Sequence, residues 1–495
     1  MGPGGVGALS GLLSALALPP FHLWPLAFLA LVPLVRVLGR EDTTPARAVG
    51  MGLAFGAAFY LPLTHWMPAT LHGLIPGGAL VGLLGMGILV GIAGLQVRLV
   101  HWLLQEGRAA PVLAVPGVWV TAEFLVARAG PVAFPWTPLG LSLASVPPLA
   151  APAELGGVAA LTLWITAVNG WVGGARKRGK ETVGRPLMWT VVLLLLLAVP
   201  AGWGVYRVGS LEQSETAPVE LVALDLDRET LLDPERRDLA AGRALERAMA
   251  GARGAAGAAP VVSLLPEAPF AAFWEEGAEA RFRGLATDRG VPLMAGTRFR
   301  VQGRPRNGVI LLGVRGREVA RHGKVRLVPA AEWPELAPGP DRGALEVAGL
   351  RIGTLICFEM GFGSRARALV RDGAHLLSNP TLDAWLRPVI RGEAGSAWSP
   401  AHAQHRAHLV LRAVETRRGA VRSPIGGELL VVDPTGGIRE LRPIGFRGAV
   451  TVTPRTTGVT TWFVRFGDLG GVAGLLILGA LVARARMPGT GLVGE

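Results

Sequence analysis

The chain has 495 residues, of which half are hydrophobic and only 17% are charged. This composition excludes an ordinary soluble enzyme of this length and indicates a membrane protein. The net charge of +13 does not indicate nucleic-acid binding, because no basic tract interleaved with aromatic residues occurs outside the loops between apolar segments, and anionic lipid headgroups are the expected counter-charge.

Eight apolar segments are predicted to be membrane-spanning helices. Several are shorter than the roughly 20 residues that a bilayer requires, and glycine and proline interrupt them. We interpret the first as a span rather than a signal peptide, because it has no basic residues before it and another apolar segment follows it directly. The segments are residues 6–18, 24–38, 49–66, 78–97, 111–126, 155–172, 188–205 and 469–483.

The charges between these segments predict the topology of the chain. Arginine and lysine follow the second, fourth and sixth segments, whereas the loop 67–77 contains neither. By the positive-inside rule, the N-terminus and the even-numbered loops are cytoplasmic. We therefore predict a seven-helix membrane domain at residues 1–206, an extracytoplasmic domain at 207–468, and an eighth transmembrane helix with a cytoplasmic tail at 469–495.

The segment 207–468 is long enough to bury a core of its own and alternates strands with helices. It is therefore predicted to be an α/β domain. Strand-like runs lie at 219–224, 261–265, 309–314, 350–356, 374–377, 429–432 and 449–453, and helical spacing is found at 236–250, 362–371 and 402–418.

Three residues of this domain are candidates for chemistry. Cys357, the only cysteine in the chain, follows a strand-like run and precedes two glycines, which is typical of a nucleophile on a tight turn. The alternative is a small buried hydrophobic residue. Lys324 is the only lysine of 207–468 in a chain that otherwise uses arginine, and Glu267 stands between two prolines at a strand end.

Two further groups of polar residues are expected to have structural roles or no specific role. Three histidines at 402, 405 and 408 recur at a spacing that does not let them converge, so we predict no metal site. Glu123 lies within a span, where a carboxylate is costly and usually paired, and Arg128 is its expected partner.

The motifs around the three candidates resemble those of the carbon-nitrogen hydrolase, or nitrilase, superfamily. They are Leu-Pro-Glu ending at Glu267, Lys324 ahead of Leu-Val-Pro and Glu332, and Ile-Cys-Phe-Glu around Cys357. The resemblance implies a four-layer αββα sandwich and a Glu-Lys-Cys triad. In such a triad Glu267 is the base, Lys324 stabilises the thiolate and the oxyanion, and Cys357 is the nucleophile.

Because this domain is inserted between membrane spans, the whole chain is similar to the apolipoprotein N-acyltransferase family. Membrane motifs at 20–26 and 134–140 carry the same resemblance. It implies ping-pong transfer of an acyl group from a phospholipid to Cys357, and then to the α-amine of an S-diacylglyceryl-cysteine apolipoprotein. It also implies the bacterial cytoplasmic (inner) membrane. We expect no cofactor, no nucleic-acid partner and a monomer surrounded by membrane lipid.

Supporting residues follow from the same resemblance. The backbone N–H of Phe358 is the expected second oxyanion donor, and Glu332 and Glu359 either shape the cleft or pair with Lys324 or a buried arginine. Four more residues match motifs after the cysteine and are assigned to a substrate loop or to structural support, namely Trp385, His405, Arg412 and Glu415. Two alternatives remain, a membrane-tethered nitrilase-like amidase and a membrane protein whose nitrilase-like domain is inactive.

Overall fold

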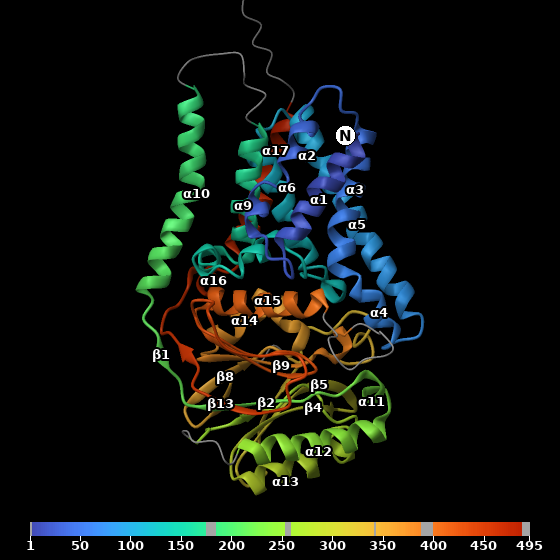
Figure 1. Cartoon of the computed structure of the whole chain (residues 1–495), viewed down its shortest axis with the longest axis vertical. Helices are drawn as coiled ribbons and strands as arrows, with labels where there is room; N and C mark the ends of the chain where they lie inside the picture. Colours follow the sequence, from blue (N-terminus) through green and yellow to red (C-terminus); the bar gives the residue numbers. More distant parts are fainter. Residues whose placement is uncertain (1, 175–184, 253–258, 341–342, 388–398, 488–495) are drawn as a thin grey trace, which may run out of the picture.

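The computed structural model describes residues 2–174, 185–252, 259–340, 343–387 and 399–487. An N-terminal bundle of helices stands above an α/β domain, and the C-terminal helix returns into the bundle (Figure 1). Most of the basic loop expected after the sixth span, and the tail 488–495, lie outside the described residues.

All eight apolar segments are helical, as predicted, but their lengths differ. Four helices of the described ranges are long and apolar enough to cross a membrane, and a fifth would be the pair Pro147–Gly156 and Val158–Gly174, which is bent by 113°. Shorter apolar helices lie at Pro3–Ala17, Trp24–Leu38 and Pro111–Val126. The prediction of a helical membrane part is therefore confirmed, and eight complete spans remain a prediction. The four long helices are α3 (Pro45–Thr64), α5 (Gly78–Gln105), α10 (Arg185–Ser210) and α17 (Leu469–Arg486).

The C-terminal helix α17 packs tightly against α6 (Pro111–Val126) and α9 (Val158–Gly174). Small residues allow this approach: a Cβ atom on Gly470 would lie 2.3 Å from the backbone nitrogen of Ala160. The first and last helical parts of the chain thus form one bundle.

The α/β domain contains two six-stranded sheets. The first has the strand order β13 (Gly448–Val452), β2 (Val219–Ala223), β3 (Ser263–Leu264), β4 (Leu293–Val301), β5 (Arg304–Leu312), β6 (Glu318–Gly323). The second has the order β12 (Ile438–Arg442), β11 (Leu429–Val432), β10 (Gly419–Ile425), β9 (Leu376–Leu382), β8 (Leu350–Thr354), β7 (Leu345–Val347). The strands β2, β3 and β4 are mutually parallel, as are β8, β9 and β10, whereas the flanking strands pair antiparallel.

The sheets pack face to face and a pair of helices covers each outer face, which gives the four αββα layers that the sequence predicted (Figure 1). Helices α12 (Pro234–Ala252) and α13 (Ala278–Arg289) cover the first sheet, and α14 (Gly363–Arg371) and α15 (Pro400–Thr416) cover the second. An apolar core lies between each pair of adjacent layers. The core around α14 and α15 continues into the membrane helices, since Leu369 and Val414 belong to the same cluster as Trp136 and Leu161.

Candidate active site

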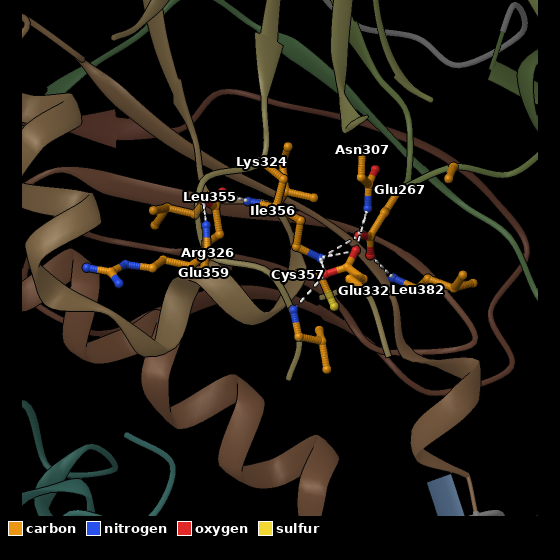
Figure 2. Close-up of polar contacts among 12 residues, drawn as sticks. Glu267, Asn307, Lys324, Arg326, Glu332, Leu355, Ile356, Cys357, Glu359 and Leu382 are labelled. Carbon is orange, nitrogen blue, oxygen red and sulfur yellow. Dashed lines mark hydrogen bonds and ion pairs between the residues drawn. The ribbon is translucent and has the colours of Figure 1, made fainter. Parts of the chain in front are cut away.

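The fold places the three candidate residues at the carboxyl ends of strands. Glu267 follows β3, Lys324 follows β6, and Cys357 follows β8. Strand β6 runs parallel to β4, because it is separated from β4 by two antiparallel pairings. In sheets of parallel strands, the carboxyl edge is where loops form binding crevices. The structure brings Glu267, Lys324 and Cys357 together at this edge (Figure 2).

Lys324 is buried between two carboxylates. Its Nζ atom donates to Oε1 of Glu267 and to a carboxylate oxygen of Glu332, each at 2.9 Å, and only 1% of the side chain is exposed. Burial alone would lower the pKa of this ammonium, but the charges of Glu267 and Glu332 outweigh burial and hold the pKa well above its usual range. Lys324 is therefore a fixed positive charge at neutral pH.

Glu267 makes contacts through both carboxylate oxygens. Oε1 accepts from Lys324 and, at 2.7 Å, from the side-chain nitrogen of Asn307, while Oε2 accepts from the backbone of Leu382 at 3.1 Å. Asn307 also donates to Glu332 at 2.8 Å, so it holds both carboxylates at a fixed separation. The sequence reasoning missed Asn307. Asn307 lies two residues before the strand-like run 309–314 and directly after Arg304, Pro305 and Arg306, and no local pattern marks it.

Cys357 occupies a strained turn. Its φ of +48° lies in the left-handed region that non-glycine residues rarely adopt. Its carbonyl oxygen accepts from the side chain of Asn379 at 3.3 Å, which helps to hold the turn. Burial, followed by the nearby charge of Glu267, raises the pKa of the thiol well above its usual range, against the opposing effect of Lys324. The resting thiol is therefore protonated, and a base must remove its proton during attack.

Glu359 connects the cysteine turn to the lysine loop. Its carboxylate accepts from the backbone nitrogens of Ile356, Val325 and Arg326 at 2.9, 2.8 and 3.0 Å (Figure 2). Burial raises the pKa of this carboxyl to about 7, although the three backbone donors lower it. Glu332 differs, because it contacts the Lys324 ammonium directly and also accepts from the backbone of Val328 at 2.8 Å.

An aromatic wall lies next to the nucleophile. The ring of Phe358 packs against Phe134, Trp136 and Phe362, with centroid distances of 6.3, 6.0 and 5.3 Å. Beyond these rings is a cavity of about 350 Å³ between the membrane helices and the cysteine loop. Phe134, Trp136 and Phe362 line it, whereas Cys357 does not. The aromatic wall thus separates the nucleophile from a space at the junction of the two parts of the protein.

The four residues assigned to a substrate loop or to support lie in different places. Arg412 donates to the carbonyl of Gly361 at 3.3 Å and pairs with Glu415 at 2.9 Å, and Glu415 accepts from the backbone of Val158 at 2.8 Å, which links α15 to α9. The backbone oxygen of Trp385 accepts from Thr70 at 2.9 Å. His405 contacts the carbonyl of Cys357 at 3.3 Å.

One predicted pairing is wrong. Arg128 pairs with Asp468 at 3.2 Å rather than with Glu123. Glu123 instead accepts from the backbone of Leu139 and from the hydroxyl of Thr162, at 2.9 and 2.7 Å. Five residues separate Glu123 from Arg128, which is more than the three or four that place side chains on one helix face, and the helix ends at Val126.

The α/β domain, with this cluster of cysteine, lysine and glutamate, resembles the carbon-nitrogen hydrolase superfamily. Residues 246–437 match the sequence profile described as carbon-nitrogen hydrolase, and residues 10–171 match the profile described as apolipoprotein N-acyltransferase N-terminal domain. An apolipoprotein N-acyltransferase from Geobacter metallireducens is 30% identical over 97% of this chain and 95% of its own length. The chain therefore belongs to the apolipoprotein N-acyltransferase family.

Two further comparisons give the range of similarity. The protein of the same name from Azotobacter vinelandii is 30% identical over 97% of this chain and 95% of its own length. Among solved structures, an amidase from Nesterenkonia sp. is 21% identical, with a TM-score of 0.38, over 52% of this chain and 95% of the amidase.

Proposed function

We propose that this protein N-acylates the α-amine of S-diacylglyceryl-cysteine in apolipoproteins, with a phospholipid as acyl donor and a thioester on Cys357 as the intermediate. Family membership supports the reaction, and the observation that carries it to named residues is the buried Lys324 ammonium held at 2.9 Å by Glu267 and by Glu332, beside a cysteine on a strained turn. The catalytic residues of this proposal are Glu267, Lys324 and Cys357.

In the first half-reaction, the Cys357 sulfur attacks the carbonyl carbon of a phospholipid ester while Glu267 takes the thiol proton. The negative charge that forms on the carbonyl oxygen is stabilised by Lys324 and by the backbone N–H of Phe358, which follows the nucleophile. The carbon–oxygen ester bond then breaks, and the departing alkoxide takes the proton from Glu267. The products are a lysophospholipid and the acyl thioester.

In the second half-reaction, the α-amine of the diacylated apolipoprotein attacks the thioester carbonyl, and Glu267 accepts a proton from the nitrogen. The carbon–sulfur bond breaks, an amide forms, and the thiolate regains a proton from Glu267. Lys324 stabilises the thiolate as it leaves, because the lysine keeps its positive charge throughout the reaction. The enzyme returns to its starting state after both substrates have reacted in turn.

The attachment of the catalytic domain to the helix bundle favours acyl transfer over hydrolysis of a soluble amide. The cysteine loop lies on α15, whose core is shared with membrane helices, and the neighbouring cavity has aromatic and aliphatic lining residues. Such a site receives an acyl chain from lipid more readily than a polar amide from water. A membrane-tethered amidase, by contrast, needs no shared core.

The topology completes the proposal. We place the catalytic domain, residues 207–468, on the extracytoplasmic face of the bacterial cytoplasmic membrane, between a seven-helix domain at 1–206 and an eighth span at 469–486. The short apolar helices α1 (Pro3–Ala17) and α6 then cross the bilayer together with the longer ones around them. The positive-inside rule applied to the loops supports this orientation.

The test combines purified protein in detergent, a phospholipid with an isotope-labelled acyl chain, and a synthetic diacylated lipopeptide. Mass spectrometry should show the labelled acyl chain as an amide on the lipopeptide, and as a mass increment on Cys357 when the lipopeptide is withheld. Cys357→Ala should show neither product. Release of labelled free fatty acid at the same rate with and without lipopeptide, and no amide, would assign hydrolysis instead.

A further inference from the structure

A second cluster of polar residues lies against Cys357, formed by Asp383 and His405. Asp383 follows β9 at the start of the short helix Asp383–Leu386, and His405 belongs to α15. Their side chains are 0% and 1% exposed, and Oδ1 of Asp383 is 3.0 Å from Nδ1 of His405. The Cys357 sulfur, one Asp383 oxygen and one His405 ring nitrogen all lie within 4.8 Å of one another. The triad chemistry described above uses neither residue.

Each ring nitrogen of His405 faces an oxygen atom. Nε2 is 3.3 Å from the carbonyl oxygen of Cys357, and Nδ1 faces the Asp383 carboxylate. A carbonyl oxygen only accepts hydrogen bonds, so the ring is the donor in the contact at Nε2. The Asp383 carboxylate orients the ring from its other side.

The surroundings hold the ring in place. The indole of Trp136, from the helix bundle, stacks on His405 at a centroid distance of 5.8 Å, and Arg422 of β10 donates to the His405 carbonyl at 2.9 Å. Arg422 also lies 3.9 Å from Asp383. The other titratable groups near His405 are His402 and His408 on its own helix and Glu428 after β10. Burial lowers the pKa of His402 and of His408 to about 4 and about 3, so both are neutral at pH 7.

We propose that Asp383 and His405 form a positioning pair that holds the Cys357 peptide. The inference rests on the proposed function only in taking Cys357 as the nucleophile. The Nε2–H group of His405 fixes the Cys357 carbonyl, and through it the strained turn and the direction of the next N–H, that of Phe358. While the turn is held, the Cys357 sulfur stays beside the positive charge of Lys324, which favours the thiolate.

Alkylation of Cys357 tests the pair without any lipid substrate. Because the chain has one cysteine, the rate of carbamidomethylation by iodoacetamide, followed by intact-protein mass spectrometry from pH 6 to 10, reports the thiolate of Cys357 alone. EDTA is present throughout, since thiolate, imidazole and carboxylate also bind metal ions. The variants are His405→Leu and His405→Ala, which remove the donor to the Cys357 carbonyl, and His405→Gln, which keeps an amide donor.

The expected result is a shift of the alkylation profile to higher pH by about one unit in His405→Leu and His405→Ala, which is about a tenfold lower rate at fixed pH, and a profile closer to that of the wild type in His405→Gln. The matched control is His402→Gln, because His402 is equally buried on the same helix and neither ring nitrogen has a hydrogen-bond partner in the described residues. Its profile should stay within twofold of the wild type.

Wild-type profiles for His405→Leu and His405→Ala would overturn the proposal, as would an equal shift in His405→Gln or in His402→Gln. Gel filtration and thermal unfolding identify a variant that does not fold, and the other donor-free variant then decides. The outcome is separate from the proposed function: if the wild type transfers no acyl group but the profile shifts, the positioning pair stands and the reaction assignment fails.

Discussion

Replacement of Lys324 by methionine removes the charge on which the proposed chemistry depends while keeping the shape of the side chain. The ammonium lies 2.9 Å from an oxygen of each of two carboxylates, and its side chain is 1% exposed. Coulomb's law with an effective dielectric constant of about 20 gives about 6 kcal/mol for each pair before desolvation is subtracted. Breaking such a buried pair costs about 3–5 kcal/mol, because an uncompensated charge is left inside.

We expect the rate of Cys357 acylation to fall at least about a hundredfold in Lys324→Met, which is the usual loss for one oxyanion donor. Lys324→Arg should lose at least as much, because a planar fork does not fit a pocket closed around a compact ammonium. The control is Arg321→Met on the same strand, since Arg321 is about one third exposed and pairs with Glu318. Single-turnover acylation measured by intact mass, with thermal unfolding as the fold check, decides the matter. Acylation of a folded Lys324→Met protein within threefold of the wild type would refute the role of the lysine.

Three further predictions follow from neighbouring contacts. Glu267→Gln should slow acylation by about 10²–10⁴, as expected for loss of a general base, and should also lower Tm, because Lys324 loses one of its two buried carboxylate partners; wild-type acylation would exclude Glu267 as the base. Glu359→Ala leaves three buried backbone donors without an acceptor, each at a cost of about 1–3 kcal/mol, so Tm should fall by several degrees. The control is Glu346→Ala, which should not lower Tm because Glu346 is exposed. Burial lowers the pKa of His402 from 6.5 to about 4, so between these pH values the unfolded chain binds more protons than the folded protein, and stability is lost as pH falls. In this pH window, the Tm of His402→Gln should therefore fall less steeply with decreasing pH than the Tm of the wild type. Equal slopes in thermal unfolding scans would contradict this.

Much of the fold could be predicted because its segments have strong hydrophobic patterns. The strands β2 and β11 lie within the predicted limits to one residue, and the helices α12, α14 and α15 within about two. The strands β4, β6, β7, β10 and β12 were missed, since each mixes arginine or glutamate with apolar residues and so lacks a continuous apolar run. These segments form strands because they pair with neighbouring strands, and a local sequence pattern does not contain that pairing.

Part of the site was equally visible in the sequence. A single cysteine, a single lysine in the domain and a proline-flanked glutamate are unusual enough to be noticed, and the structure places them together. The contact between Asp383 and His405 could not be predicted, because 22 residues and a change from strand to helix separate them. The geometry of the strained cysteine turn likewise depends on tertiary contacts, such as that from Asn379.

The core shared by α15 and the membrane helices has a consequence for how the protein is made. Glu154, near the start of α9, pairs with Arg207 and with Arg417, a residue that the ribosome adds 263 positions later. The place of α17 beside α6 and α9 is filled later still. The first helices to enter the membrane must therefore wait, with part of their packing surface uncovered, until nearly the whole chain has been translated. A truncation after the catalytic domain should consequently leave an incompletely assembled bundle, rather than an enzyme that merely lacks an anchor.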